Sequence, residues 1–212
     1  MNKRNQARML GLALAFAATL PSTTSAAGAD FQADASTIAR VENYLNSITT
    51  LRASFLQVAP DGAVSEGMLY LARPGRLRIE YDPPATVLMV GNGSRIVYYD
   101  RKLGQVSELP LTSPLAQILI RRQIRLGDDL GVVAVVRAGG VLRITLADID
   151  DPGAGQVTLM FNDNPLGLRQ WSVKDAQGLE TRITLMERWF GLPIDSALFD
   201  PPGPLVPSAA ER

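Results

Sequence analysis

The residue types that usually carry out catalysis or bind metals are scarce in this chain of 212 residues. Histidine and cysteine are absent, so the sequence excludes Ser-His-Asp and Cys-His catalysis, imidazole or thiolate metal ligands, and disulfides. Asp148, Asp150 and Asp151 have the residue type and spacing that begin a calcium-binding loop. Pro152 occupies the next ligand position and no glutamate closes the loop, so we interpret the segment as a solvated turn and predict no metal site.

The other charged residues define neither an enzyme nor a nucleic-acid-binding protein. Basic and acidic residues number 21 each, so no net positive charge would attract a nucleic acid. Carboxylates, serines and lysines remain available for hydrolysis, but no spacing singles out a catalytic pair. We therefore expect a non-enzymatic protein without a cofactor. A hydrolase stays an alternative that turnover of an ester or a glycoside would support.

Arg73 is the charged residue with the most informative position. It follows an apolar segment, residues 68–72, and comes directly before the turn Pro74-Gly75. The simpler interpretation is a solvated arginine at the end of a strand. In the alternative interpretation, the side chain turns inward beneath the helices. There its five N–H donors would bind carbonyl oxygens at the end of a helix or loop and hold a lid closed.

Residues 1–27 have the pattern of a cleaved secretory signal peptide. Three basic residues (Lys3, Arg4 and Arg8) precede the apolar run 9–20, and small residues follow it as far as Ala27. Twelve residues of helix rise about 18 Å, which is too short to cross a hydrocarbon core of about 30 Å. We expect an exported protein, located in the periplasm if the source is a bacterium with two membranes.

The remaining residues, 28–212, are predicted to form one domain made mostly of strands, with a Pro-rich C-terminal tail. One helix is predicted over 35–48, on the helical spacing of Ile38, Val41, Leu45 and Ile48. A second is predicted over 114–122, where Leu115, Ile118 and Leu119 share one face. Turns rich in Gly, Pro and Asn separate about ten predicted strands, at 51–58, 66–73, 76–82, 86–90, 95–99, 105–109, 132–137, 141–147, 156–162, 168–174 and 180–188.

The apolar residues of these strands predict a sheet with a covered face. In the strand 76–82, Leu77, Ile79 and Tyr81 alternate with charged residues, which indicates one buried and one solvated face. The segments 68–71 and 87–90 are apolar on both faces. A sheet of about ten strands curls strongly, and two short helices would cover only part of its inner face. An apolar cavity and an interior filled by side chains both remain possible.

Several short stretches occur in an order that points to a known family. They are 50–57 (TLRASFLQ), 67–74 (GMLYLARP) and 77–84 (LRIEYDPP), followed by 91–93 before 96–100, by 113–115, and by 195–202. Together with the signal peptide, they resemble the LolA-type family, the periplasmic carrier proteins for outer-membrane lipoproteins. The similarity covers about residues 36–207 and is most specific over 50–84.

The resemblance implies a mainly β (α+β) fold, an incomplete antiparallel β-barrel or strongly curved sheet with helices as a lid over an apolar cavity. It implies that Arg73 corresponds to the family's lid-latching arginine. It also implies that the cavity is lined by Leu77, Ile79, Tyr81 and Met89. The residues that it assigns to the lid are Ile38, Val41, Leu45, Leu115, Ile118 and Leu119.

The function implied by the resemblance is that of a carrier. Members of the family accept an acylated lipoprotein from an inner-membrane ABC transporter and pass it to an outer-membrane lipoprotein receptor. We therefore expect a monomeric periplasmic carrier that binds acyl chains and has no nucleic-acid partner. The alternative is a lipid-binding or envelope-stress sensor module of the same fold that does not shuttle lipoproteins.

Overall fold

The computed structural model describes residues 35–93, 95–109, 118–127 and 130–201. The described residues all belong to one compact unit. The predicted signal peptide (1–27), the lid residue Leu115 and residues 202–212 of the predicted tail lie outside the described ranges. No helix within those ranges is long and apolar enough to span a membrane.

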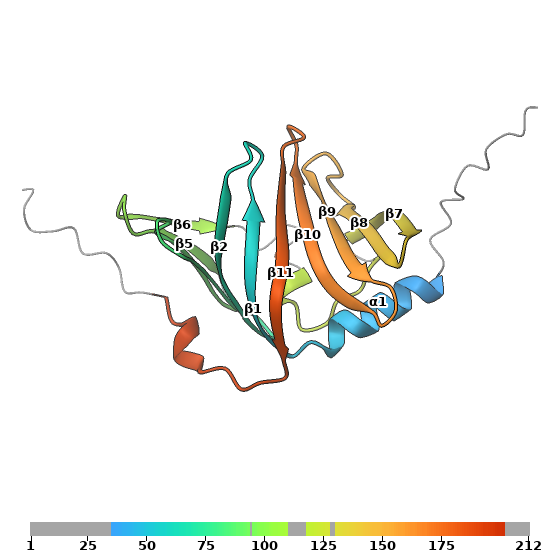
Figure 1. The fold of residues 1–212 in the computed structure, drawn as a ribbon, viewed down its shortest axis with the longest axis horizontal. Helices are drawn as coiled ribbons and strands as arrows, with labels where there is room; N and C mark the ends of the chain where they lie inside the picture. Colours follow the sequence, from blue (N-terminus) through green and yellow to red (C-terminus); the bar gives the residue numbers. More distant parts are fainter. Residues whose placement is uncertain (1–34, 94, 110–117, 128–129, 202–212) are drawn as a thin grey trace, which may run out of the picture. The chain divides into compact units, whose positions relative to one another are not determined.

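Eleven antiparallel strands of the described residues form one sheet (Figure 1). The strands are β1 (Thr50–Val58), β2 (Val64–Ala72), β3 (Arg76–Tyr81), β4 (Val87–Asn92), β5 (Ile96–Asp100), β6 (Gln105–Leu109), β7 (Leu130–Ala138), β8 (Val141–Asp148), β9 (Gly155–Asn162), β10 (Gly167–Asp175) and β11 (Glu180–Phe190). The helix α1 (Ala35–Ser47) precedes them and a single 3-10 turn, η1 (Ser196–Phe199), follows them. Residues 118–120 are also helical, within the second predicted helix.

The strand order is β6-β5-β4-β3-β2-β1-β11-β10-β9-β8-β7, so two meanders meet where β1 pairs with β11. This topology corrects the predicted incomplete barrel. The edge strands β6 and β7 do not pair with each other, so the sheet of the described residues is open, and it is not strongly curled. The first and last strands, β1 and β11, pair with each other in the middle of the sheet and do not form its edges.

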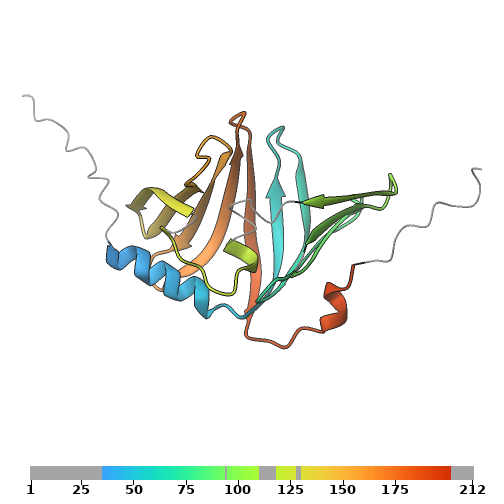
Figure 2. The same cartoon turned by 180° about the vertical axis from the view of Figure 1, so that it is seen from behind.

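The main hydrophobic core lies between one face of the sheet and the helical segments. Figure 2 shows α1 and the helical residues 118–120 on the same face. Val41 and Leu45 of α1 are buried, as are Ile118 and Leu119, and all four belong to one apolar cluster with the strands. The helical spacing of the apolar residues thus places α1 against the sheet, as its pattern predicts.

A second, smaller cluster lies on the opposite face of the strands that follow β3. It consists of Leu88, Val90, Val97 and Tyr99. Their alternation with Met89 agrees with the prediction that 87–90 is apolar on both faces. The segment carrying η1 packs on β3 and β4, where Arg78 Nη1 donates a hydrogen bond to the Leu198 carbonyl oxygen at 3.2 Å.

Candidate ligand cavity beneath a helical lid

An apolar cavity of about 80 Å³ lies in the wall of the sheet. Its lining comes from β1, β2, β3, β4, β10 and β11. The lining residues are Phe55, Gln57, Leu69, Ile79, Tyr81, Met89, Trp171 and Ile183. Pockets that hold small ligands usually measure about 300–1,000 Å³, and a cavity of about 150 Å³ accepts benzene. In this conformation the interior is therefore too full for an acyl chain.

Strand register brings part of this lining together. Gln57 of β1 is paired with Ile183 of β11, which is paired in turn with Trp171 of β10. Side chains at paired positions point to the same face, so these three form one row across the cavity wall. Residues 114 positions apart in the sequence therefore meet in one wall.

A glycine allows two aromatic rings to meet in the lining of the cavity. Gly67 is paired with both Phe55 and Tyr81, and the two rings pack edge to face with centroids 5.2 Å apart. A Cβ atom at Gly67 would lie 2.9 Å from a Phe55 ring carbon and closer still to the Glu80 carbonyl oxygen. The absence of a side chain at this position is what lets the rings close over the strand.

Three cavity residues carry polar side-chain atoms. The Tyr81 hydroxyl donates a hydrogen bond of 2.7 Å to Gln57 Oε1. Burial, together with the smaller influence of Tyr98, raises the pKa of Tyr81 to about 12, so its hydroxyl stays protonated and neutral. Trp171 is 3% exposed, and its indole Nε1 has no hydrogen-bond partner among the described residues.

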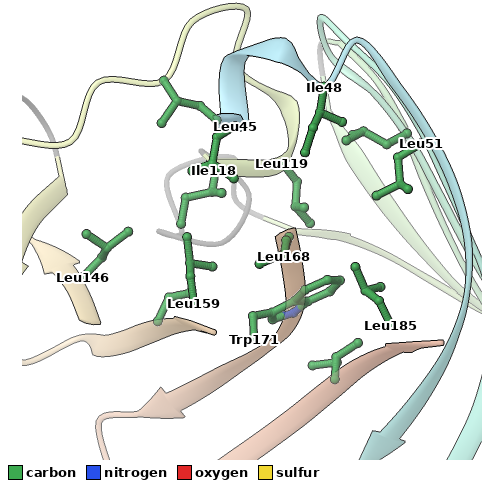
Figure 3. Close-up of a cluster of buried hydrophobic side chains, with 14 of the residues drawn as sticks. Leu45, Ile48, Leu51, Ile118, Leu119, Leu146, Leu159, Leu168, Trp171 and Leu185 are labelled. Carbon is green, nitrogen blue, oxygen red and sulfur yellow. The ribbon is translucent and has the colours of Figure 1, made fainter. Parts of the chain in front are cut away.

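The predicted lid segments contribute hydrocarbon side chains to the interior. In Figure 3, Leu45 from α1 and Ile118 and Leu119 from the second helical segment point toward Leu168 and Trp171 of the sheet. These residues belong to the main apolar cluster. Movement of the lid would therefore open the space that its own side chains now fill.

Arg73 connects the sheet to both parts of the lid. Its Nη1 donates to the carbonyl oxygen of Leu45 at 2.5 Å, Nη2 to that of Ile118 at 2.6 Å and Nε to that of Leu119 at 3.1 Å. Burial lowers the pKa of Arg73 to about 10, which leaves the guanidinium charged at neutral pH. No carboxylate of the described residues forms an ion pair with it, so carbonyl dipoles alone compensate the buried charge there.

Other polar contacts fasten α1 to the chain that follows residue 120. Asn46 donates to the Ile124 carbonyl oxygen at 2.9 Å and accepts from the Ile124 N–H at 2.8 Å. The Glu42 carboxylate accepts from the Leu126 N–H, and Arg40 forms an ion pair with Asp163. The two lid segments are thus linked to each other as well as to the sheet.

The structure brings together most of the residues predicted for this site. Ile79, Tyr81 and Met89 line the cavity. Leu77 does not: it is 3% exposed within the main cluster, because it is paired with Leu71 and Gly91 nearer the lid-side end of β3. Ile38 packs against the cluster and is only partly buried. The roles of these residues as latch, lining and lid stay predictions.

The sequence interpretation missed five lining residues, namely Phe55, Gln57, Leu69, Trp171 and Ile183. Phe55 and Gln57 lie two residues apart in a predicted strand, so their shared face was available from the alternating pattern. Trp171 and Ile183 carry no comparable signal, because their proximity to Gln57 depends on the β1–β11 pairing.

The predicted solvated turn after β8 is confirmed by its hydrogen bonds. Asp148 Oδ1 accepts from the N–H groups of Asp150 at 2.8 Å and Asp151 at 3.2 Å. Within the described part of the chain, no group of three or more acidic side chains is arranged to hold a metal ion. The carboxylate of this segment therefore acts on its own backbone.

An open antiparallel sheet with an apolar cavity and a helical lid defines a class of binding protein in which one sheet face and its cover enclose hydrocarbon. Comparison with known proteins identifies the family. The family model of the outer membrane lipoprotein carrier protein LolA matches residues 46–201, and the chain belongs to this family.

Individual relatives agree with this assignment. The chain is 30% identical over 179 residues to an outer-membrane lipoprotein carrier protein of Azotobacter vinelandii, covering 80% of this chain and 85% of the relative. It is 28% identical over 178 residues to one of Methylococcus capsulatus, covering 79% and 84%. Among solved structures, it is similar to a LolA superfamily protein from Nitrosomonas europaea, with a TM-score of 0.46, 11% identity, and coverage of 77% of this chain and 97% of that one.

Membership of this family makes the chain a lipoprotein carrier by homology, a transport protein and not an enzyme. The family is periplasmic and takes part in outer-membrane biogenesis.

Proposed function

We propose that this protein binds the acyl chains of lipoproteins in its apolar interior and carries them from the inner to the outer membrane. The observation that carries the proposal is the contact of Arg73 with carbonyl oxygens of both lid segments above that interior. Ligand entry would separate the lid from the sheet and break these hydrogen bonds. A closed, unloaded conformation would account for the small volume of the cavity.

The energetics of acyl chains favour a lid that closes spontaneously. Each buried CH₂ group contributes about 0.8 kcal/mol, so three chains of sixteen carbons would contribute roughly 35 kcal/mol if fully buried. Noncovalent affinities reach a limit near about 20 kcal/mol. A carrier must therefore leave part of each chain uncovered or use part of the gain to open. Opening would break the Arg73 hydrogen bonds and the packing of Leu45, Ile118 and Leu119, and this cost would reduce the free energy gained by burying acyl chains.

The partners and location follow from this role. An inner-membrane ABC transporter would supply the lipoprotein, and an outer-membrane lipoprotein receptor would accept it. The protein would act as a monomer after export and removal of residues 1–27. Residues 38, 41, 45, 115, 118 and 119 would belong to the lid, and residues 79, 81 and 89 to the binding wall.

The test is to identify what the protein carries. The tagged protein is purified from periplasm without detergent, and bound molecules are identified by intact-mass spectrometry. A triacylated protein supports the carrier, whereas free lipid alone supports a lipid-binding sensor module. A second step mixes the loaded carrier with purified outer-membrane receptor and follows the lipoprotein by pull-down. Stable partner binding without transfer of the lipoprotein would contradict the shuttle.

A further inference from the structure

The indole N–H of Trp171 is a hydrogen-bond donor without a partner in an apolar wall. Trp171 is 3% exposed and lines the cavity, and its Nε1 has no partner among the described residues. Buried donors of this kind are rare, because the hydrogen bond lost to water is not replaced. Such a donor becomes useful when a ligand brings an acceptor to it.

The neighbouring strands offer no acceptor side chain. Trp171 is paired on one side with Leu159 and on the other with Ile183, both of which are buried hydrocarbons. Gln57 is the amide nearest in the same row, but Ile183 separates it from Trp171. The oxygen of Gln57 already accepts from Tyr81.

The lid above Trp171 is similarly committed. Leu45, Ile118 and Leu119 present hydrocarbon toward the sheet (Figure 3). Their carbonyl oxygens accept from Arg73, and the Ile120 carbonyl oxygen accepts from the Gly75 N–H at 2.7 Å. These four carbonyl oxygens thus accept from Arg73 and Gly75, and none of them accepts from Trp171 Nε1.

We propose that, once ligand entry has opened the interior, Trp171 Nε1–H donates a hydrogen bond to the ester carbonyl oxygen of a fatty acyl group held there. This inference rests on the proposed function and specifies which chemical group of the cargo the protein recognises by a hydrogen bond. An alkyl chain alone brings no acceptor, and a carboxylate would bring a charge that is costly to bury. A hydroxyl or an amide would bring a further donor with no acceptor of its own. An ester adds an acceptor and nothing else.

The experiment compares two probes with the same number of carbon atoms, methyl laurate and n-tridecane, binding to the full chain. Affinities are measured by displacement of a fluorescent fatty acid analogue. We expect Trp171→Phe, which keeps an aromatic ring but removes the N–H, to weaken methyl laurate binding about tenfold, as the loss of one ordinary hydrogen bond implies. Binding of n-tridecane is expected to change less than about twofold. Because each probe is compared with itself, differences in their hydration cancel.

A matched control is available because the sequence has two tryptophans. Trp189 lies on β11, is 37% exposed and stacks on Arg52, so Trp189→Phe is expected to leave the affinities for both probes unchanged. The same variant assigns the two indole N–H signals in an NMR spectrum by elimination. In wild-type protein, methyl laurate should move the Trp171 signal downfield and n-tridecane should not. This readout needs no substitution at the site and so does not depend on whether Trp171→Phe folds.

The outcomes separate the two proposals. If both probes bind wild-type protein and Trp171→Phe weakens them equally or not at all, or if the Trp171 signal responds alike to both, the ester contact is wrong and the carrier stands. If neither probe binds wild-type protein, the acyl cavity itself fails, and the ester contact fails with it.

Discussion

Arg73 Nη2 and the Ile118 carbonyl oxygen lie 2.6 Å apart, although 45 residues separate them in the sequence. This hydrogen bond joins the end of β2 to the second lid segment. The same guanidinium also reaches the C-terminal part of α1 through Leu45. One side chain thus connects the sheet to both predicted lid segments.

Replacement of Arg73 by leucine should favour the open lid. Three carbonyl oxygens lose a charged donor, each contact contributing on the order of 1 kcal/mol in a partly buried setting. Hydrogen exchange of the amides in α1 and in 118–127 should accelerate at least about tenfold. Release of the lipoprotein to a purified acceptor should become slower, because the closed form that expels the cargo is disfavoured.

Two further variants test this interpretation. Arg73→Lys should give an intermediate effect, because one ammonium cannot span three carbonyl oxygens as a planar guanidinium does. Arg95→Leu, which removes an exposed side chain paired with Glu108, should leave exchange and release unchanged. Unchanged release by Arg73→Leu would count against the latch.

Met89→Glu should prevent acyl binding without preventing folding. Met89 lines the cavity and is only partly buried, so a carboxylate there meets the ligand before it meets the core. We expect at least a tenfold loss of affinity for a fluorescent fatty acid analogue, and little change for Met89→Leu. Leu77→Glu should instead abolish folding, as judged by circular dichroism, since Leu77 is 3% exposed in the core. Normal binding by folded Met89→Glu would remove Met89 from the site.

Gly67→Ala should destabilise the fold by at least about 2 kcal/mol, because the added Cβ collides with Phe55 and with the backbone of β3. The measurement is the free energy of unfolding in urea. Gly167→Ala is the matched control, since a Cβ at that strand glycine meets nothing within 4 Å. Similar stabilities for the two variants would mean that the ring pair over Gly67 adapts easily.

Tyr81 should make stability depend on alkaline pH. Burial raises its pKa to about 12 from the ordinary 10.0, so above pH 10 the unfolded chain releases a proton that the folded chain keeps. Stability is therefore lost as the pH rises from about 10 to about 12, by about 1 kcal/mol at pH 11. Arg73 acts in the opposite direction, because its pKa is lowered.

The difference between wild type and Tyr81→Phe isolates the tyrosine from Arg73. Urea unfolding at about pH 9 and about pH 11 should show that the wild type loses more stability than the variant. Equal losses in both proteins would mean that the Tyr81 hydroxyl ionises normally in the folded state.

Local patterns predicted the elements well, because burial of one face imposes a period that the sequence must follow. The predicted helix 35–48 was confirmed as Ala35–Ser47. Ile79 and Tyr81 line the cavity, but the opposite face of β3 is not simply solvated, because the Arg78 side chain is only 14% exposed and donates a hydrogen bond to the Leu198 carbonyl oxygen. The order of the strands in the sheet could not be predicted in this way. The pairing of β1 with β11 joins residues more than 120 positions apart, and no local pattern encodes it. Trp171 and Ile183 enter the cavity wall only through that pairing, and Leu77 leaves it because of its place along β3.

The segment around η1 constrains how the protein can enlarge its interior. Strands β3 and β4 supply Ile79 and Met89 to the cavity, while Arg78 and Arg76 on β3 contact Leu198 and the ring of Phe199. That wall is thus braced from behind by the last described residues of the chain. We therefore expect that loading of bulky cargo displaces α1 and residues 118–120 and leaves β3 and β4 in place.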